Sequence, residues 1–157
     1  MQHEKILEVL NRPLARQMLA SNIPARLAYT GRDGAPRAIP IAFHWDGSRF
    51  VVCTPPHAAK VPALRADPRV ALTIDTNTFP PHVLLVRGTA SIEIVDGVPP
   101  EYLAGSRKIV GAAGMAAFEE QVRGLYTQMA RIAIEPRWAK LLDFETTLPS
   151  AVEELLR

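Results

Sequence analysis

Residues 25–76 read ARLAYTGRDGAPRAIPIAFHWDGSRFVVCTPPHAAKVPALRADPRVALTIDT, and this stretch decides the fold. Two Asp-Gly pairs, Asp33-Gly34 and Asp46-Gly47, each separate two runs rich in β-forming residues. Asp-Gly between such runs is a strong signal for a hairpin turn. The pattern therefore predicts two tight turns joining three strands, over residues 26–30, 37–45 and 49–54.

A short helix and a fourth strand complete this unit. Residues 57–66 carry Ala58, Val61 and Leu64 and end before Pro68, which predicts a short helix that starts near His57. Residues 70–75 then read as a strand. On the N-terminal side, residues 1–24 form an expected helical arm, with apolar residues at helical spacing over residues 4–10 and 14–20.

The C-terminal half alternates strands and helices. Residues 82–95 read as one long strand, in which Gly88 indicates a bulge or a close approach of two backbones. Residues 99–130 form an expected helical insertion, with helices over 101–109 and 115–128. Strands are expected over 131–135 and 138–144, separated by a break at Pro136. Residues 146–157 form a tail, in which Ser150 is expected to cap a closing helix over residues 151–156.

The order of these elements predicts the fold class. The 157 residues suit one domain with its own hydrophobic core. Helices at both ends and strands joined by short turns predict an α+β protein with a mostly antiparallel sheet of six or seven strands. A long strand that bends at a glycine is typical of a small barrel. We therefore expect a single domain, residues 1–157, built as a β-barrel with peripheral helices.

Composition excludes several classes of protein. The net charge is only +2 and no run of Lys or Arg is present, so nucleic acid is not an expected partner. The single Cys53 excludes an intrachain disulfide and a cysteine-cluster metal site, and its apolar neighbours predict a small buried side chain. No secretory pattern and no apolar run of membrane-spanning length is visible. We expect a cytoplasmic protein that does not bind membranes.

The junction between residues 54 and 60 is the strongest candidate site. Thr54, His57 and Lys60 place a hydroxyl, an imidazole and an ammonium close together where a strand ends and a helix is expected to begin. Such a junction favours an anion, and lysine suits a phosphate. Arg37 lies just past the first hairpin and is expected to approach the same end of the sheet. The alternative is a solvated helix start with a surface lysine. The four histidines are scattered, so no metal site is predicted.

An ordered set of residues in this region resembles the pyridoxamine 5′-phosphate oxidase-like family of flavin-binding split β-barrels. The set is Gly34, Pro36, Pro40, Phe43, Trp45-Asp46-Gly47, Phe50, Thr54, Lys60, Leu64 and Asp67 to Leu72, followed by Val86 to Ala90, Ile132 to Pro136 and Trp138. The resemblance covers about residues 14 to 144. It implies a homodimer of split barrels that binds two flavins, usually FMN, in clefts between the subunits.

The resemblance also assigns residues to the cofactor. It implies that the flavin ring lies against the backbone of the second strand, formed here by Arg37, Ala38, Ile39, Pro40 and Ile41. It places the phosphate at Thr54, His57, Ala59 and Lys60. The family often carries Ser-Arg-Lys or Arg-x-Lys at this point, whereas this chain has Ala58-Ala59-Lys60 and keeps only the lysine. Arg37 or His57 is expected to replace the missing arginine.

Further residues are candidates for contact with the flavin ring or the substrate. Trp138 and Phe79 are candidates for contact with the ring or the substrate from the partner subunit, the alternative being ordinary core packing. The helices of residues 99–130 are expected to roof the substrate side of the cleft. No catalytic residue is assigned, because hydride transfer to or from a small unsaturated substrate needs no covalent nucleophile.

The family offers two further readings of the function. One is a reductase that uses the deazaflavin F420, whose acidic tail would meet Arg37, Lys60 and Arg87. The other is a non-catalytic carrier or sensor of flavin or haem. Pyridoxal phosphate synthesis itself is not expected, because the chain ends in Leu148-Pro149-Ser150 and a short helix instead of the arginine- and histidine-containing segment of that enzyme.

Overall fold

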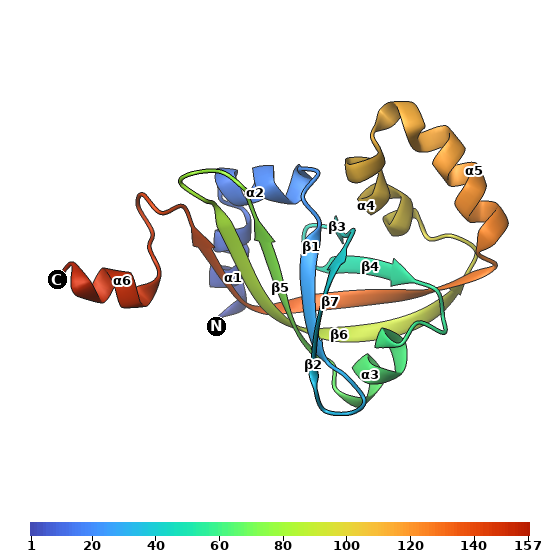
Figure 1. Cartoon of the computed structure of the whole chain (residues 1–157), viewed down its shortest axis with the longest axis horizontal. Helices are drawn as coiled ribbons and strands as arrows, with labels where there is room; N and C mark the ends of the chain where they lie inside the picture. Colours follow the sequence, from blue (N-terminus) through green and yellow to red (C-terminus); the bar gives the residue numbers. More distant parts are fainter.

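A computed structural model describes residues 1–157 and contains six α-helices and seven strands (Figure 1). The helices are α1 (His3–Leu10), α2 (Pro13–Ala20), α3 (Lys60–Ala66), α4 (Pro100–Val110), α5 (Met115–Leu125) and α6 (Ser150–Leu155), with a short 3-10 turn at Ala112–Gly114. The strands are β1 (Ala25–Thr30), β2 (Pro36–Ile41), β3 (His44–Trp45), β4 (Phe50–Thr54), β5 (Arg69–Asp75), β6 (Val83–Asp96) and β7 (Gln128–Leu142).

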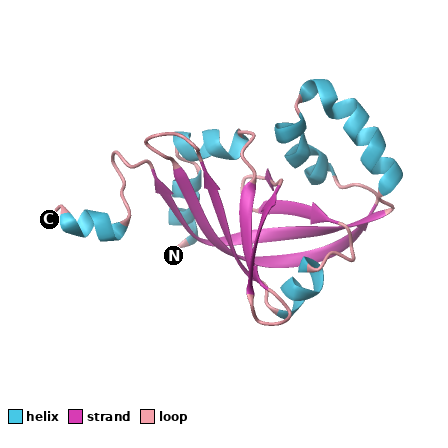
Figure 2. Ribbon diagram, in the orientation of Figure 1, coloured by secondary structure: helices cyan, strands magenta, loops and turns pink.

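All seven strands form one antiparallel sheet in the order β2-β1-β5-β6-β7-β4-β3 (Figure 2). The strands at its two ends, β2 and β3, are separated by only Ala42 and Phe43 in the sequence. So short a connection keeps the two edges of the sheet close together, although no hydrogen-bonded ladder joins them. This arrangement is consistent with a split barrel. The predicted α+β class with a mostly antiparallel sheet is confirmed, with seven strands.

The two predicted hairpin turns are confirmed, but the strand expected over residues 37–45 is wrong. Gly34 and Gly47 both have positive φ, 81° and 98°, which is the conformation that makes glycine favourable in these turns. The chain leaves the sheet at Ala42 and Phe43, because the Phe43 side chain is 1% exposed and packs in the core. As a result β2 pairs with β1, and β3 pairs with β4, as two separate hairpins.

The break expected at Pro136 is also wrong, because β7 runs without interruption for 15 residues. The register between β6 and β7 shifts between Arg87 and Gly88, so that Gly88 faces Pro136 while Arg87 faces Trp138. Proline is tolerated at such a bulge. A Cβ atom on Gly88 would lie 2.6 Å from the Glu135 carbonyl oxygen. The predicted close backbone approach at Gly88 is therefore confirmed.

The core has two parts. The larger cluster lies inside the curved sheet, contains Phe50, Ile132 and Ile134, and is closed at one end by α1 and α2. The smaller cluster lies beneath α4 and α5 and contains Cys53, Val122 and Met129. Cys53 is free and 7% exposed, and burial raises the pKa of its thiol to about 12. Cys53 is thus the buried, unreactive side chain that the sequence predicts.

The remaining boundaries differ in small ways. Helix α3 starts at Lys60 instead of His57, and α5 ends at Leu125. Ser150 is the first residue of α6 and does not cap it; its hydroxyl accepts a hydrogen bond from Lys140.

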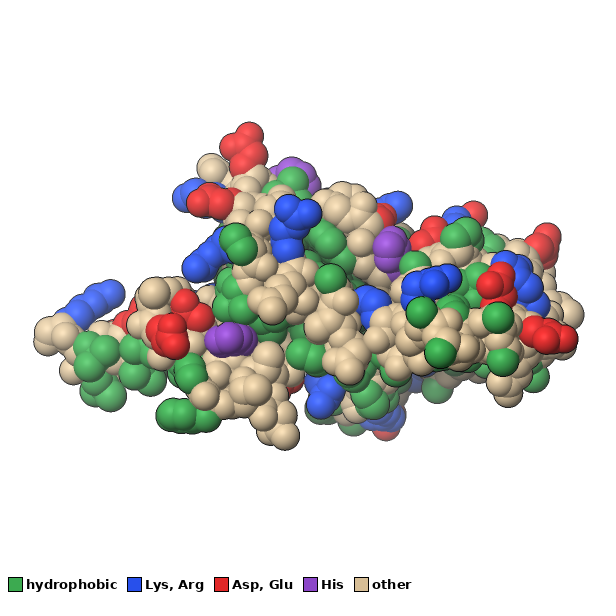
Figure 3. Space-filling view, turned by 90° about the horizontal axis from the view of Figure 1, so that it is seen from above, with side chains coloured by type: hydrophobic (Ala, Val, Ile, Leu, Met, Phe, Trp, Pro, Cys, Tyr) green, Lys and Arg blue, Asp and Glu red, His purple; other side chains and the backbone are tan.

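Exposed apolar side chains gather over the C-terminal segment at the left of Figure 3. None of the helices has both the length and the apolar character needed to cross a membrane.

Candidate functional site

Strand β2 presents an open edge. It forms a ladder with β1 only, so the backbone groups on its other side have no strand partner. Pro36, Arg37, Ala38 and Pro40 are exposed, while Ile39 and Ile41 are half-buried. An unpaired strand edge offers a row of N–H and C=O groups to another molecule. The backbone that the family resemblance assigns to the flavin ring is therefore accessible in this chain.

Thr54 and Lys60 form a polar pair beyond the end of β4. The Lys60 ammonium donates a hydrogen bond of 3.2 Å to the Thr54 hydroxyl, which is only 5% exposed. Burial lowers the pKa of Lys60, and no carboxylate forms an ion pair with it. A half-buried ammonium without a counter-ion favours an anion at this position.

The turn before α3 departs from the expected geometry. His57 and Ala59 lie in this turn, and both are exposed. Because α3 begins at Lys60 and has only 7 residues, a helix dipole contributes less to this corner than the sequence suggests. The ammonium of Lys60 and the hydroxyl of Thr54 are the groups that define its chemistry.

A cavity of about 230 Å³ joins this turn to the first hairpin. It is lined by Tyr29, Gly31, Arg32, Asp33, Arg37, Ala59 and Ala63. Arg37 thus approaches the turn before α3, as the sequence led us to expect. Its guanidinium donates a hydrogen bond of 3.0 Å to the Asp33 carboxylate, and this contact lowers the pKa of Asp33. Arg32 reaches the same cavity, but its place in the hairpin turn gave no sign of this.

A second cavity, the apolar pocket, lies at the other end of β2. It has a volume of about 360 Å³ and is lined by Pro40, Ile41, Ala42, Cys53, Tyr102, Ser106, Ile109, Val110 and Phe118. Helices α4 and α5 of the insertion therefore cover the cavity next to the β2 backbone. Burial raises the pKa of the Tyr102 phenol, which stays protonated at neutral pH.

The apolar pocket contains most of the residues that the sequence analysis missed. Tyr102, Ser106 and Phe118 were not singled out, although the insertion was expected to roof the cleft. The spacing of Tyr102, Ser106 and Val110 by four residues puts them on one face of a helix, which was the available signal. Cys53 gave no such signal, because it stands within a uniformly apolar strand.

Arg87 and Trp138 lie on a different surface. They are cross-strand neighbours on β6 and β7, and the Arg87 guanidinium stands 4.2 Å from the centre of the Trp138 ring. Arg87 lines a third cavity of about 510 Å³ together with Arg37, Arg69 and Arg137, which we name the arginine hollow. Lys60 does not line it. The arginine hollow therefore brings Arg87 and Arg37 to one cavity, and its lining includes neither Trp138 nor Lys60.

Phe79 packs against no core. Its side chain is 98% exposed in the loop between β5 and β6. The core-packing alternative for this residue is therefore wrong.

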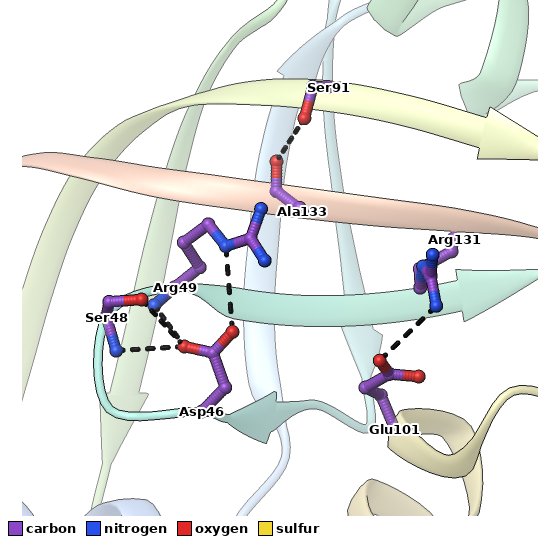
Figure 4. A network of polar contacts seen from close by, with 7 residues as sticks. All are labelled: Asp46, Ser48, Arg49, Ser91, Glu101, Arg131 and Ala133. Carbon is purple, nitrogen blue, oxygen red and sulfur yellow. Dashed lines mark hydrogen bonds and ion pairs between the residues drawn. The ribbon is translucent and has the colours of Figure 1, made fainter.

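Two polar networks hold α4 against β7 and fix the turn between β3 and β4 (Figure 4). Arg131 of β7 donates hydrogen bonds to Glu93 at 2.7 Å and to Glu101, in the first turn of α4, at 3.4 Å. The second oxygen of Glu101 is buried without a partner, so the contact with Arg131 is what offsets the cost of placing this carboxylate against the sheet. The Asp46 carboxylate accepts hydrogen bonds from two backbone amides and fixes the turn before β4.

The opposite face of α4 carries a half-buried lysine. The Lys108 ammonium lies 3.5 Å from the centre of the Phe43 ring and donates a hydrogen bond of 3.0 Å to the Leu19 carbonyl of α2. Both contacts favour the ammonium, but burial acts in the other direction and lowers the pKa of Lys108 to about 8. The same face of α4 packs closely on the segment between β2 and β3, because Gly105 leaves no Cβ against the Phe43 backbone.

This lysine predicts a pH dependence of stability. In the unfolded chain Lys108 has its ordinary pKa of 10.5. Between pH 8 and 10.5 the unfolded chain therefore binds more protons at this residue than the folded chain, so the Lys108 contribution to stability rises with pH across that window. We expect Lys108→Met to remove this rise, as measured by urea unfolding at several pH values. Lys5→Met, at an exposed site on α1, should keep it; an unchanged profile in Lys108→Met would contradict the prediction.

Comparison with known proteins identifies the family. The family model described as pyridoxamine 5′-phosphate oxidase matches residues 12–139. Solved structures with a similar fold include an F420 reductase, with a TM-score of 0.56, 19% identity, and coverage of 80% of this chain and 94% of its own. An FAD-binding protein from Mesorhizobium loti has a TM-score of 0.53 and 17% identity, covering 82% of this chain and 89% of its own.

A third solved structure with a similar fold is that of a haem storage protein. HutZ, the haem storage protein from Vibrio cholerae, has a TM-score of 0.57 and 16% identity, and the match covers 84% of this chain and 93% of its own. At these identities the likeness shows the fold alone. No curated protein sequence matches this chain. The family model nevertheless spans most of the chain, from the start of α2 into β7, and the chain therefore belongs to the pyridoxamine 5′-phosphate oxidase family.

Proposed function

We propose that this chain is an FMN-dependent oxidoreductase that acts on a small unsaturated substrate. The observation that carries the proposal is the half-buried Lys60 ammonium, which is bonded to Thr54 and has no counter-ion. A phosphate at this position would supply the missing charge and accept hydrogen bonds from both side chains. The open edge of β2 and the apolar pocket at its end suit a flat ring system next to a second ligand.

The residues of this chain fit the cofactor as follows. Thr54 and Lys60 hold the phosphate, and Arg37 approaches from the neighbouring hairpin in place of the arginine that the family often carries before the lysine. His57 and Ala59 lie exposed in the same turn, where His57 can add a further contact. The backbone of Arg37 to Ile41 orients the ring. Bound FMN supplies hydride exchange, while the protein contributes orientation, electrostatics and the exclusion of water.

A second copy of the chain completes this site in our proposal. The edge of β2 is open, Phe79 is almost fully exposed, and the Arg87 guanidinium stands over the Trp138 ring outside the hydrophobic core. In the proposed two-fold dimer, an outer face of one chain lies against the site of the other, and the symmetry repeats this contact for the second site. Arg87, Trp138 and Phe79 would then reach the cofactor or the substrate from the partner subunit.

An F420-dependent reductase is the second candidate. The observation that favours it is the arginine hollow, which brings Arg37 and Arg87 together with Arg69 and Arg137. Arg37, Arg69 and Arg137 each form an ion pair with a carboxylate, and Arg87 does not. A ligand with several negative charges, such as the acidic tail of F420, would meet Arg87 directly and compete with these carboxylates for the other three. The fold is also shared with an F420 reductase. A carrier role for flavin or haem is the third reading, and the fold of a haem storage protein agrees with it.

The absorption spectrum of the purified protein and of the chromophore released by heat separates these functions. We expect the spectrum of an oxidised flavin, and a released chromophore that migrates as FMN. Binding of added F420 but not of FMN would put the reductase reading first. A Soret band would overturn both enzyme readings in favour of haem. If the protein binds FMN but no pair of electron donor and acceptor supports turnover, the carrier role would be favoured.

A further inference from the structure

The apolar pocket and its neighbour on the other side of α4 differ sharply in chemistry. The cavity on the far side has a volume of about 640 Å³, and its lining includes Arg16, Arg107 and Lys108. The apolar pocket has no Lys, Arg, His, Asp or Glu in its lining. Helix α4 divides the two, since Ala104, Arg107 and Lys108 face one cavity and Tyr102, Ser106 and Val110 face the other. The spacing of three and four residues explains this division.

The polar groups of the apolar pocket are few and uncharged. They are the phenol of Tyr102, the hydroxyl of Ser106, which is 4% exposed, and the thiol of Cys53. Burial keeps both the phenol and the thiol protonated, because it raises the pKa of each group. A charged ligand would lose its hydration here and meet no opposite charge. A neutral ligand with one hydrogen-bonding group would meet a matching hydroxyl.

We propose that the apolar pocket is the substrate site, and that it selects an uncharged, mostly apolar ring compound over a phosphorylated one. The proposal rests on the proposed function, because the pocket adjoins Pro40 and Ile41 of the strand that holds the flavin ring. The volume of about 360 Å³ lies in the range of small-molecule sites. A bicyclic molecule with one hydroxyl or carbonyl group matches this size and this chemistry.

Helices α4 and α5 contribute five of the nine residues that line the pocket, so these two helices set much of its selectivity. Ile109 and Val110 are 50% and 38% exposed, at the rim of the pocket, and Phe118 of α5 closes it from the other helix. Ile109 and Val110 lie at the C-terminal end of α4, and an apolar ligand in the pocket would cover their exposed side chains. Tyr102 and Ser106 lie deeper on the same face of α4 and meet the polar group of that ligand.

Two fluorescent probes test the selectivity directly. Naphthol is neutral and bicyclic, whereas naphthalenesulfonate has the same rings and a negative charge. We expect naphthol to bind in a saturable manner, and naphthalenesulfonate to bind about tenfold or more weakly because its charge is desolvated without a partner. The titrations are made by fluorescence on the protein without FMN and on the protein saturated with FMN. Equal or tighter binding of the sulfonate would overturn the proposal.

Variants locate the probe. Ile109→Glu puts a carboxylate at the rim and should weaken naphthol binding by about tenfold or more. Leu125→Glu is the matched control: it replaces a leucine of α5 that is 64% exposed and outside the pocket, and it should leave binding unchanged. Tyr102→Phe keeps the ring and removes one hydrogen bond, which predicts a loss of about two- to twelvefold. Unchanged binding in both Ile109→Glu and Tyr102→Phe would contradict the site.

The titrations with and without FMN also separate this inference from the proposed function on which it rests. In the proposal the flavin ring lies against the β2 backbone and the substrate lies beside it, so naphthol should bind with similar or higher affinity when FMN is present. Competition between FMN and naphthol would mean that the cofactor occupies the pocket, and the substrate assignment would be wrong. A protein that binds naphthol in an Ile109-dependent way but binds no flavin would refute the proposed function and keep the pocket as a ligand site. If Ile109→Glu changes the sedimentation of the protein and not naphthol binding, the face is a subunit contact and the inference fails.

Discussion

Replacing Lys60 by Ala is expected to weaken FMN binding by about ten- to a hundredfold, since a hydrogen bond to a charged group contributes about 1.5–3 kcal/mol. The ammonium is half-buried, donates to Thr54 and has no carboxylate partner. Its removal should therefore cost little in the cofactor-free protein, because no buried anion loses its partner. The free energy of unfolding and the affinity for FMN can be measured on the same sample by urea unfolding and by quenching of flavin fluorescence.

Two further variants give this measurement its controls. Lys60→Arg keeps the charge and should recover most of the affinity, although the shape of a guanidinium differs from that of an ammonium. Lys5→Ala removes an exposed lysine of α1 and should change nothing. Unchanged FMN affinity in Lys60→Ala would show that the phosphate is held elsewhere. A loss of affinity for F420 but not for FMN would favour the second candidate function.

Local sequence signals predicted much of the fold. The turns at Asp33-Gly34 and Asp46-Gly47 depend on a conformation that glycine adopts readily, so each pair could be recognised without knowledge of the rest of the chain. Gly88 was recognised for a related reason, because a long strand with an internal glycine points to a close backbone contact, and the Glu135 carbonyl oxygen provides it.

The errors arose where a distant element decides the local structure. Pro136 would end an isolated strand, but the bulge against Gly88 of β6 accommodates it within β7. The strand predicted over residues 37–45 divides because Phe43 turns into a core built by other strands. Neither partner is adjacent in the sequence, so neither outcome follows from local pattern.

The candidate site was predicted where its residues are close in the sequence and was missed where distant elements form it. Thr54 and Lys60 were expected to lie close together where the strand ends, and the Lys60 ammonium donates a hydrogen bond to the Thr54 hydroxyl. The apolar pocket, by contrast, joins β2 and β4 to helices that follow some 50 residues later in the chain. The charge division on α4 was visible in the sequence, but which face meets β2 depends on the close packing of Gly105 against Phe43.

Phe50→Ala is expected to have the largest effect on stability, a loss of about 3–5 kcal/mol in the free energy of unfolding. Phe50 is fully buried, and its ring lies 4.6 Å from Trp45 and 5.7 Å from Phe43, between centres. It is also paired with Ile134 of β7 and with Trp45 of β3. Truncation would open a cavity between β4, its neighbouring strands β3 and β7, and the Phe43 ring. Urea unfolding followed by tryptophan fluorescence measures the loss.

Phe79→Ala is the matched control, because the same side chain is removed from a loop where it is 98% exposed. In a monomer this change should alter the free energy of unfolding by no more than about 0.5 kcal/mol. If Phe79 contacts a partner subunit, its removal should raise the dissociation constant of the dimer and lower the unfolding midpoint at concentrations where the wild type is dimeric, and it should change little at concentrations where both proteins are monomeric. Phe50→Ala should instead lower stability at every concentration. If Phe50→Ala lowers the free energy of unfolding by less than about 1 kcal/mol, the assignment of Phe50 to the core would be contradicted. If Phe79→Ala and the wild type behave identically at all protein concentrations, Phe79 is not part of the proposed dimer contact.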